Sequence, residues 1–173
     1  MNSSAEPVLN IRHSNISDAE QIYAVVRDAF SREEEAALVA AVRQAGEAVI
    51  ELCAFLADEL VGHVLLSPIR IEPHVDLNCL GIAPVSVLTR LHGNGVGSAL
   101  MGRAIEEARG RSVDAIFLLG APAYYQRFGF QRTHIGNEYG ATDAFLVLEL
   151  EKGCLAATEG TARYVSAFSD TGV

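Results

Sequence analysis

The sequence predicts an α/β (α+β) protein in which helices pack on a mixed β-sheet. Two observations support this fold class. Segments with strand character occur both before and after helical segments, and two of them are predicted to form a hairpin around Asp58-Glu59. One strand–helix–strand unit surrounds a glycine-rich stretch, which indicates a crossover between parallel strands. At 173 residues the chain has the length of one domain, so we expect residues 1–173 to form a single domain.

The first elements follow from hydrophobic spacing and capping patterns. Residues 8–13 are expected to form a strand. Ser17 to Glu20 read as a capping box, and the apolar residues behind them recur at helical spacing. Ser31 to Glu34 repeat the box and predict a second helix that ends at Gly46.

Three further strands are expected over residues 48–57, 60–71 and 79–88. The glycine stretch then leads into an amphipathic helix. The residues expected on its apolar face are Leu100, Met101, Ala104, Ile105 and Ala108. Residues 114–120 form a short continuous apolar run, as in a strand that is buried on both faces.

The last quarter of the chain is expected to be mainly β-structure. A short helix at residues 123–128 precedes a strand after Gly129. A strand at residues 144–150 and a final strand near residues 161–168 complete the chain.

Composition excludes several classes of function. Thirteen basic and 22 acidic residues give a net charge of −9, so the basic footprint of a nucleic-acid-binding protein is missing. The apolar runs are too short to span a membrane, and no secretory signal is visible, so we expect a soluble, cytoplasmic protein. Three separate cysteines and five single histidines predict reduced thiols and no metal site.

The most informative stretch is HGNGVGSALM, residues 92–101, because three glycines at alternate positions stand directly before a helix. The free amides and the dipole of a helix N-terminus favour an anion, and glycines let a phosphate approach the backbone closely. The alternative is a purely structural turn into the helix.

Other phosphate motifs and one hydrolase motif do not fit this stretch. A P-loop requires a lysine that is missing here. The dinucleotide fingerprint fails because Ser98 and Leu100 occupy its third position in the two registers. The serine-hydrolase elbow fails because Val96 and Leu100 flank Gly97-Ser98-Ala99.

What remains resembles the GNAT superfamily of N-acetyltransferases, whose signature is Gln/Arg-x-x-Gly-x-Gly/Ala between the fourth strand and the third helix. Here the motif stands as His92-Gly93-Asn94-Gly95-Val96-Gly97. LLGAPAYYQRFGF resembles the fifth strand and following helix, and DELVGHVLLSPI resembles the hairpin of strands two and three. Residues 8–168 follow the family's order of elements and are most similar to a bacterial subgroup of predicted acetyltransferases.

The resemblance implies a GNAT fold, with a mostly antiparallel sheet of about six to seven strands that splays apart between strands four and five. It also implies an acetyl-CoA-dependent N-acetyltransferase that acts on a primary amine of a small molecule or peptide. The alternative is a non-catalytic acyl-CoA-binding sensor or partner subunit. Homodimers are common in the family, but the sequence carries no dimer signature, and it does not identify the acceptor.

The cofactor-binding residues implied by the resemblance are Val85, Val87, His92, Gly93, Asn94, Gly95, Val96, Gly97 and Ser98. Val85 and Val87 would offer backbone groups to the pantetheine arm, although ordinary core valines fit the sequence equally well. The loop residues would bind the pyrophosphate. At position 92 the family has Gln or Arg, and a neutral imidazole can donate one hydrogen bond to a phosphate but lacks the guanidinium fork. We therefore expect weaker or more pH-dependent cofactor binding.

The resemblance also implies two catalytic groups. The Val87 amide would face the thioester carbonyl, and the Tyr125 hydroxyl would protonate the leaving thiolate. The alternative for Tyr125 is packing at the edge of the core. The general base is unassigned: the strand at residues 79–88 has no carboxylate, and Asp76 and the run Glu33-Glu34-Glu35 are the nearest candidates. His63 is expected to be a hydrogen-bonded core residue.

Overall fold

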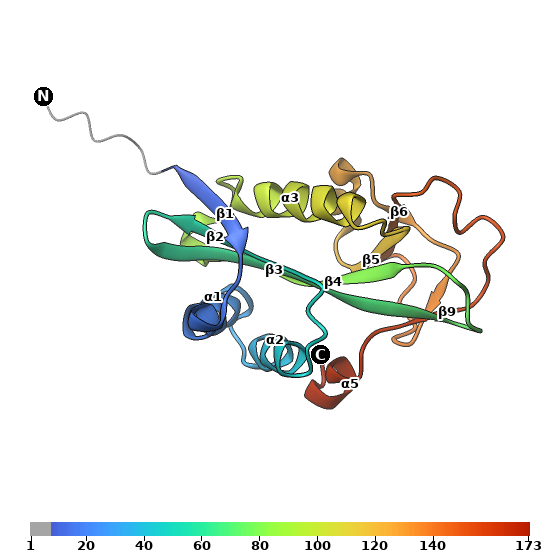
Figure 1. Cartoon of the computed structure of the whole chain (residues 1–173), viewed down its shortest axis with the longest axis horizontal. Coiled ribbons are helices and arrows are strands. Elements are labelled where there is room, and N and C mark those ends of the chain that lie inside the picture. Colours follow the sequence, from blue (N-terminus) through green and yellow to red (C-terminus); the bar gives the residue numbers. More distant parts are fainter. Residues whose placement is uncertain (1–7) are drawn as a thin grey trace, which may run out of the picture.

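A computed structural model describes residues 8–173 as a twisted β-sheet with helices on both faces (Figure 1). The main path of the sheet has the strand order β1-β2-β3-β4-β5-β8-β6, and two short strands, β7 and β9, extend from the end of β3. All pairs along the main path are antiparallel except β4 with β5, whose connection runs through α3. The mixed, mostly antiparallel sheet predicted from the sequence is confirmed.

The first half of the chain alternates between sheet and helices. Its elements are β1 (Leu9–His13), a 3₁₀ turn (Ile16–Asp18), α1 (Ala19–Phe30), α2 (Glu34–Gln44), β2 (Ile50–Leu56) and β3 (Glu59–Glu72). The hairpin between β2 and β3 turns at Ala57-Asp58, one residue before the expected position, because Leu56 pairs with Glu59.

The second half contains the parallel crossover and several short strands. Its elements are β4 (Cys79–Val87), a 3₁₀ turn (Thr89–Leu91), α3 (Val96–Gly110), β5 (Ala115–Leu119), α4 (Pro122–Tyr125), a 3₁₀ turn (Gln126–Phe128), β6 (Gln131–Arg132), β7 (Gly136–Asn137), β8 (Phe145–Glu149), β9 (Thr161–Arg163) and α5 (Ala167–Thr171).

Both helix caps expected from the sequence are wrong. The capping box is formed by Asn15 and Asp18, and Ser17 bonds to the Asn15 side chain instead of capping α1. Ser31 does not open α2, because it ends α1 in a left-handed conformation with φ +56°, and its N–H donates to the Arg27 carbonyl.

The expected final strand near residues 161–168 is also only partly correct. Strand β9 is limited to Thr161–Arg163, the residues that pair with β3, and Ala167–Thr171 form α5. The chain therefore turns back from the sheet, and α5 packs beside α2.

The sheet separates two hydrophobic cores. Helices α1, α2 and α5 cover one face, and α3 covers the other (Figure 1). Leu100, Met101 and Ala104 of α3 are fully buried, as the spacing of its apolar residues predicts. Burial of each larger apolar side chain contributes roughly 1.5–3 kcal/mol to stability.

The sheet opens where β4 and β5 separate. β5 pairs with β4 only from Cys79 to Ile82. Beyond Ile82, the register of β4 on β3 shifts between Val64 and Leu66, which indicates a β-bulge that bends β4. The second half of β4 therefore has β3 on one edge and no strand of the described chain on the other.

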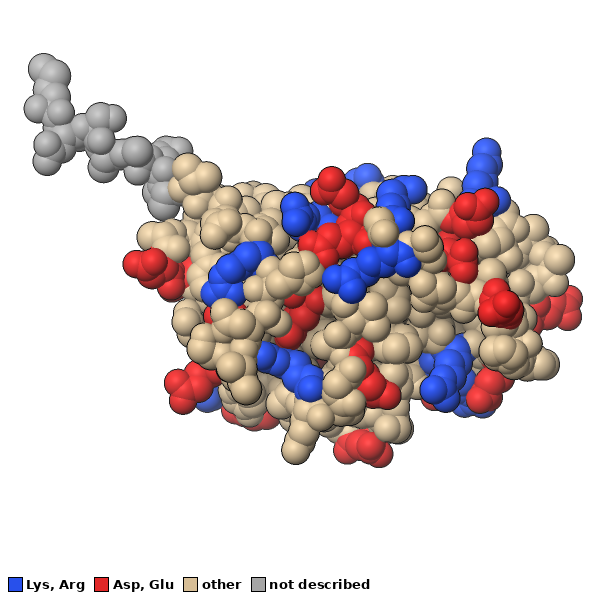
Figure 2. Space-filling view, viewed as in Figure 1, with Lys and Arg blue, Asp and Glu red and all other residues tan. Residues whose placement is uncertain are grey.

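The surface shows no concentration of one charge on the face seen in Figure 2, where basic and acidic side chains alternate. Several charged side chains of the protein form ion pairs, such as Arg103 with Glu107. No helix within residues 8–173 is long and apolar enough to cross a membrane.

Candidate functional site

The opening between β4 and β5 continues into a cleft of about 800 Å³. The cleft reaches from the start of α3, past the ends of β4 and β5, to α1, α2 and the C-terminal segment. Of the residues predicted to bind the cofactor, Val85, Val87, His92, Gly93, Gly95, Val96, Gly97 and Ser98 line it. Tyr125 lines it as well. Asn94 does not, because it forms the turn, where its N–H donates to the Leu91 carbonyl.

The backbone of β4 presents its polar groups to this cleft. The N–H of Leu88 donates to the Val61 carbonyl of β3 over 2.9 Å. Because successive residues of a strand direct their backbone groups to opposite edges, Val87 and Val85 direct theirs away from β3. The edge that they face is the one that β5 leaves free beyond Ile82.

The glycine loop brings the N-terminus of α3 to the same cleft. Gly93 and Gly95 have φ values of +80° and +82°, a conformation that side chains strongly disfavour, which accounts for glycine at both positions. The first backbone bond of α3 runs from the Ala99 N–H to the Gly95 carbonyl. The amides of residues 96–98 precede this bond and have no acceptor within the helix, so the helix start offers donors to an anion.

The His92 side chain forms a different hydrogen bond from the one expected from the sequence. Its Nε2 atom lies 2.9 Å from the Val87 carbonyl oxygen. A carbonyl only accepts, so Nε2 carries the proton and donates. The Nδ1 atom of the neutral imidazole is then an acceptor and has no hydrogen to donate to a phosphate. The imidazole hydrogen that was expected to bond to a phosphate therefore bonds to the Val87 carbonyl instead.

Arg127 is a site residue that the sequence reasoning missed. Its Nη2 atom donates to the Ser98 Oγ over 2.9 Å, and its guanidinium carbon lies 4.1 Å from the centre of the Tyr124 ring. It lines the cleft beside the first turn of α3. The available signal was the arginine inside the YQRFGF motif, but only the fold shows that α4 and the following turn return to α3.

Two aromatic residues of α4 pack closely against glycines of neighbouring elements. A Cβ atom at Gly120 would lie 2.3 Å from the Tyr125 ring, and one at Gly97 would lie 2.8 Å from the Tyr124 hydroxyl. Both glycines therefore leave room for tyrosines that line the cleft. Burial raises the pKa of Tyr125 to about 12, so its hydroxyl remains protonated near neutral pH.

The acidic residues that the sequence offers as candidates for the general base differ in their position relative to the cleft. Glu35, in the first turn of α2, is only 4% exposed and lines the cleft, whereas Glu33, Glu34 and Asp76 are outside it. The sequence could not distinguish Glu35 from its neighbours, because a run of three glutamates is typical of a solvated helix start. Glu35 is the only Asp or Glu that lines the cleft within the described part of the chain.

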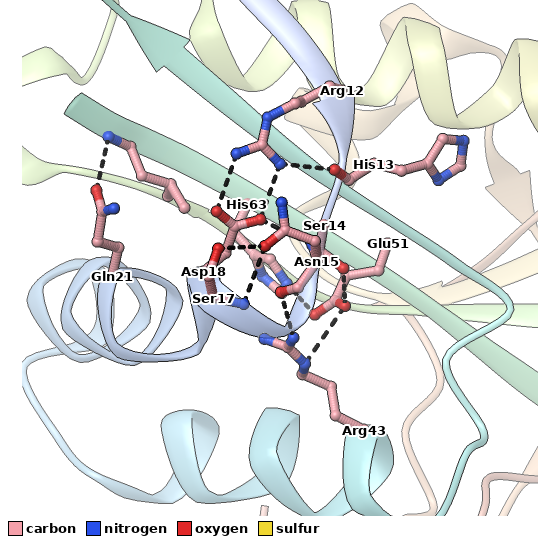
Figure 3. A network of polar contacts seen from close by, with 11 residues as sticks. Arg12, His13, Ser14, Asn15, Ser17, Asp18, Gln21, Arg43, Glu51 and His63 are labelled. Atoms are coloured by element: carbon pink, nitrogen blue, oxygen red, sulfur yellow. Dashed lines mark hydrogen bonds and ion pairs between the residues drawn. The ribbon is translucent and has the colours of Figure 1, made fainter. Parts of the chain in front are cut away.

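His63 lies outside the cleft and is a hydrogen-bonded core residue, as predicted (Figure 3). Its Nε2 is 2.8 Å from the Glu51 Oε1, and the other Glu51 oxygen accepts from Ser14. Burial alone would raise the pKa of Glu51, but the hydrogen bonds from His63 and Ser14 and the charge of Arg43 outweigh it and lower this pKa. The network joins β1, β2 and β3 to α2.

No group of three or more metal-ligating side chains is present within residues 8–173. The cleft instead combines an open strand edge, a helix N-terminus with free amides and a cation close to it. This combination suits an elongated ligand that carries phosphate at one end. Such a ligand would place its body along β4.

Comparisons with known proteins agree with this class of site. The family model described as an acetyltransferase (GNAT) domain matches residues 10–133. The chain therefore belongs to the GNAT family of acetyltransferases, and it is an acyltransferase. It is 30% identical to the uncharacterized N-acetyltransferase YhbS of Escherichia coli K12, over 88% of this chain and 93% of YhbS. Identity to the uncharacterized N-acetyltransferase YjhQ of the same strain is 31%, over 85% of this chain and 82% of YjhQ.

Two solved structures are similar to the whole chain. The crystal structure of E. coli YhbS in complex with CoA has a TM-score of 0.90 at 28% identity and covers 98% of this chain and 96% of its own. A GNAT family acetyltransferase from Brucella melitensis in complex with acetyl-CoA has a TM-score of 0.80 at 29% identity, with coverage of 93% and 98%. The GNAT fold expected from the sequence is thus confirmed.

Proposed function

We propose that this protein binds acetyl-CoA in the cleft between β4 and β5 and transfers the acetyl group to a primary amine of a small molecule or peptide. The observation that carries the proposal is the meeting of a free strand edge and a free helix N-terminus in one cleft. The relatives YhbS, solved with CoA, and the Brucella protein, solved with acetyl-CoA, support the choice of ligand.

The phosphate end of acetyl-CoA is assigned to the loop and to Arg127. The amides of Val96, Gly97 and Ser98 are donors at the positive end of the α3 dipole, and Gly93 and Gly95 allow the loop to expose them. Arg127 supplies the charge that the family's arginine supplies from position 92. A hydrogen bond between charged groups contributes about 1.5–3 kcal/mol, more than a bond from a neutral imidazole.

The pantetheine arm is assigned to the free edge of β4, where Val85 and Val87 offer backbone groups. In this arrangement the Val87 N–H donates to the thioester carbonyl oxygen, which gains negative charge as the amine attacks. Removal of one such donor in other enzymes costs about 2.7–4 kcal/mol of transition-state stabilisation. Asn94 supports the loop without contacting the ligand directly.

Tyr125 is assigned as the general acid. When the carbon–sulfur bond breaks, CoA leaves as a thiolate, and the Tyr125 hydroxyl gives it a proton. The raised pKa of Tyr125 means that its hydroxyl carries a proton near neutral pH, so a proton is present when the thiolate forms. The acceptor amine attacks in its unprotonated form and loses one further proton to solvent as its nitrogen becomes the amide nitrogen of the acetylated product, and Tyr125 regains its proton from solvent.

The test is release of free thiol from acetyl-CoA in the presence of a panel of primary amines. The panel should contain monoamines, diamines, amino acids and peptides with a free N-terminus. Amine-dependent thiol release with an acetylated product supports the proposal. Tight binding of acetyl-CoA without thiol release for any amine would contradict it and indicate a non-catalytic acyl-CoA-binding protein.

A further inference from the structure

The half of the cleft that faces away from the glycine loop has a distinct chemistry. Its walls come from the end of α1, the start of α2 and the C-terminal third of the chain. The side chains there that carry the argument are Phe30, Glu35, Tyr139, Tyr164 and Phe168. This end of the cleft therefore combines four aromatic rings with one carboxylate.

Three of these aromatic rings form a connected wall. The ring centres of Tyr139 and Tyr164 are 5.8 Å apart, and those of Tyr164 and Phe168 are 4.6 Å apart. Gly81 of β4 makes room for this wall, because a Cβ atom there would lie 2.7 Å from the Tyr164 ring. Aromatic faces attract cations as well as apolar groups.

Glu35 and Tyr164 each retain an unused polar atom. Within residues 8–173, the buried Oε2 of Glu35 and the buried hydroxyl of Tyr164 have no hydrogen-bond partner. The other oxygen of Glu35 accepts from Arg32, whose own side chain is 55% exposed and stands outside the cleft. Buried polar atoms without a protein partner are costly, so each of these two atoms requires a partner such as a bound water or a ligand.

The charged groups of the cleft are divided between its two ends. Arg127 lies at the glycine loop, and Glu35 is the only Asp or Glu among the described residues that line the cleft. A ligand with phosphate at the loop end thus leaves an aromatic compartment that contains the Glu35 carboxylate for the second substrate. A positive group is favoured there, and a second carboxylate is disfavoured.

We propose that Glu35 binds the ammonium group of the acceptor, and that this acceptor is a primary amine on an aromatic or apolar body without a carboxylate beside the amine. The inference rests on the proposed function, because the compartment is assigned to the acetyl acceptor. It goes further by naming the residue that selects the acceptor and the chemical class selected. Glu35 acts in binding through its Oε2, while Arg32 holds the other oxygen.

The experiment measures binding of three probes of similar shape, with the protein both free and saturated with CoA. The probes are 2-phenylethylamine, its neutral analogue 2-phenylethanol and its carboxylated analogue phenylalanine. Each is titrated by NMR into the wild-type protein, Glu35→Gln and Glu34→Gln. Glu34 is exposed in the same helical turn and is the matched control. Acetyl-CoA affinity is measured for all three proteins.

We expect the amine to bind the wild-type protein at least tenfold more tightly than the alcohol or the amino acid. Glu35→Gln should lose this preference with an unchanged acetyl-CoA affinity, and Glu34→Gln should keep it. No binding of the amine, equal binding of all three probes or an unchanged preference in Glu35→Gln would overturn the inference. Failure of the wild-type protein to bind acetyl-CoA would instead overturn the proposed function, and the titrations of the free protein would still decide the role of Glu35.

Discussion

The Nη2 atom of Arg127 lies 2.9 Å from the Oγ of Ser98, which joins the turn after α4 to the first turn of α3. The two residues are 29 positions apart in the chain. Their contact places a guanidinium beside the amides at the helix start, and the stacked Tyr124 ring holds it there. In the proposed site, Arg127 takes the place of the cation that is missing at position 92.

Replacement of Arg127 should weaken acetyl-CoA binding substantially. Loss of a charge-assisted hydrogen bond of about 1.5–3 kcal/mol predicts at least a tenfold rise in the Kd of Arg127→Ala. Titration calorimetry measures this Kd. Arg132→Ala is the control, because Arg132 pairs with Asp143 on the surface and does not line the cleft. An unchanged Kd for Arg127→Ala would remove Arg127 from the phosphate site.

Replacement of His92 should have a smaller effect on binding than replacement of Arg127. The Nε2 proton of His92 is used by the Val87 carbonyl, so a neutral imidazole contributes no donor to the phosphate. We expect His92→Ala to lower stability by about 0.5–1 kcal/mol through the lost hydrogen bond. The Kd for acetyl-CoA at pH 8 should rise less than in Arg127→Ala. The opposite order of the two Kd values would indicate that His92 contributes more to phosphate binding than Arg127 does.

Addition of one methyl group at Gly97 should disturb the packing at the start of α3. The new Cβ would lie 2.8 Å from the Tyr124 hydroxyl and would displace the ring that supports Arg127. Gly97→Ala should therefore raise the Kd about tenfold or more, because the charge-assisted bond of about 1.5–3 kcal/mol is lost with that support. The control is Gly102→Ala in the same helix, where the Cβ meets no atom within 4 Å. That substitution should leave the Kd unchanged and stabilise α3 by about 0.5–1 kcal/mol. Equal Kd values for the two variants would show that Tyr124 does not support the site.

Removal of the Tyr125 hydroxyl should affect turnover rather than binding. General acid catalysis contributes about 10²–10⁴-fold, so Tyr125→Phe should lower kcat by about a hundredfold or more and leave the Kd for acetyl-CoA unchanged. Because burial raises its pKa to about 12, Tyr125 keeps its proton below that pH. The wild-type kcat should therefore show no loss from Tyr125 ionisation between pH 6 and about pH 10. A kcat that is unchanged in Tyr125→Phe would leave this residue with a packing role.

The sequence predicted the elements that leave a local trace. Gly93 and Gly95 were recognisable because positive φ angles require glycine, and the strand and helix around them set the crossover. The same local reasoning failed at Ser17, where two overlapping capping patterns compete and Asn15 with Asp18 forms the box. It failed again after Arg163, because the alternating pattern continues beyond the three residues that pair with β3.

The parts of the site that depend on long-range packing could not be predicted from the sequence. Arg127 reaches α3 only because α4 folds back toward the glycine loop, and its Ser98 contact has no local pattern. Glu35 differs from Glu33 and Glu34 only by the helix face that α2 turns toward the cleft. The bond from His92 to Val87 likewise requires the turn after β4 to bring the ring to the strand edge.

The most direct test of the acetyl-CoA site is the thermal unfolding of the protein with saturating acetyl-CoA, ATP or NADH. A ligand at about 100 times its Kd stabilises the folded state by roughly 2.7 kcal/mol, which raises the melting temperature measurably. The cleft predicts a rise with acetyl-CoA, a strongly reduced rise in Gly97→Ala and no comparable rise with ATP or NADH. No rise with acetyl-CoA, or an equal rise with all three ligands, would contradict the assignment of the cleft to acetyl-CoA.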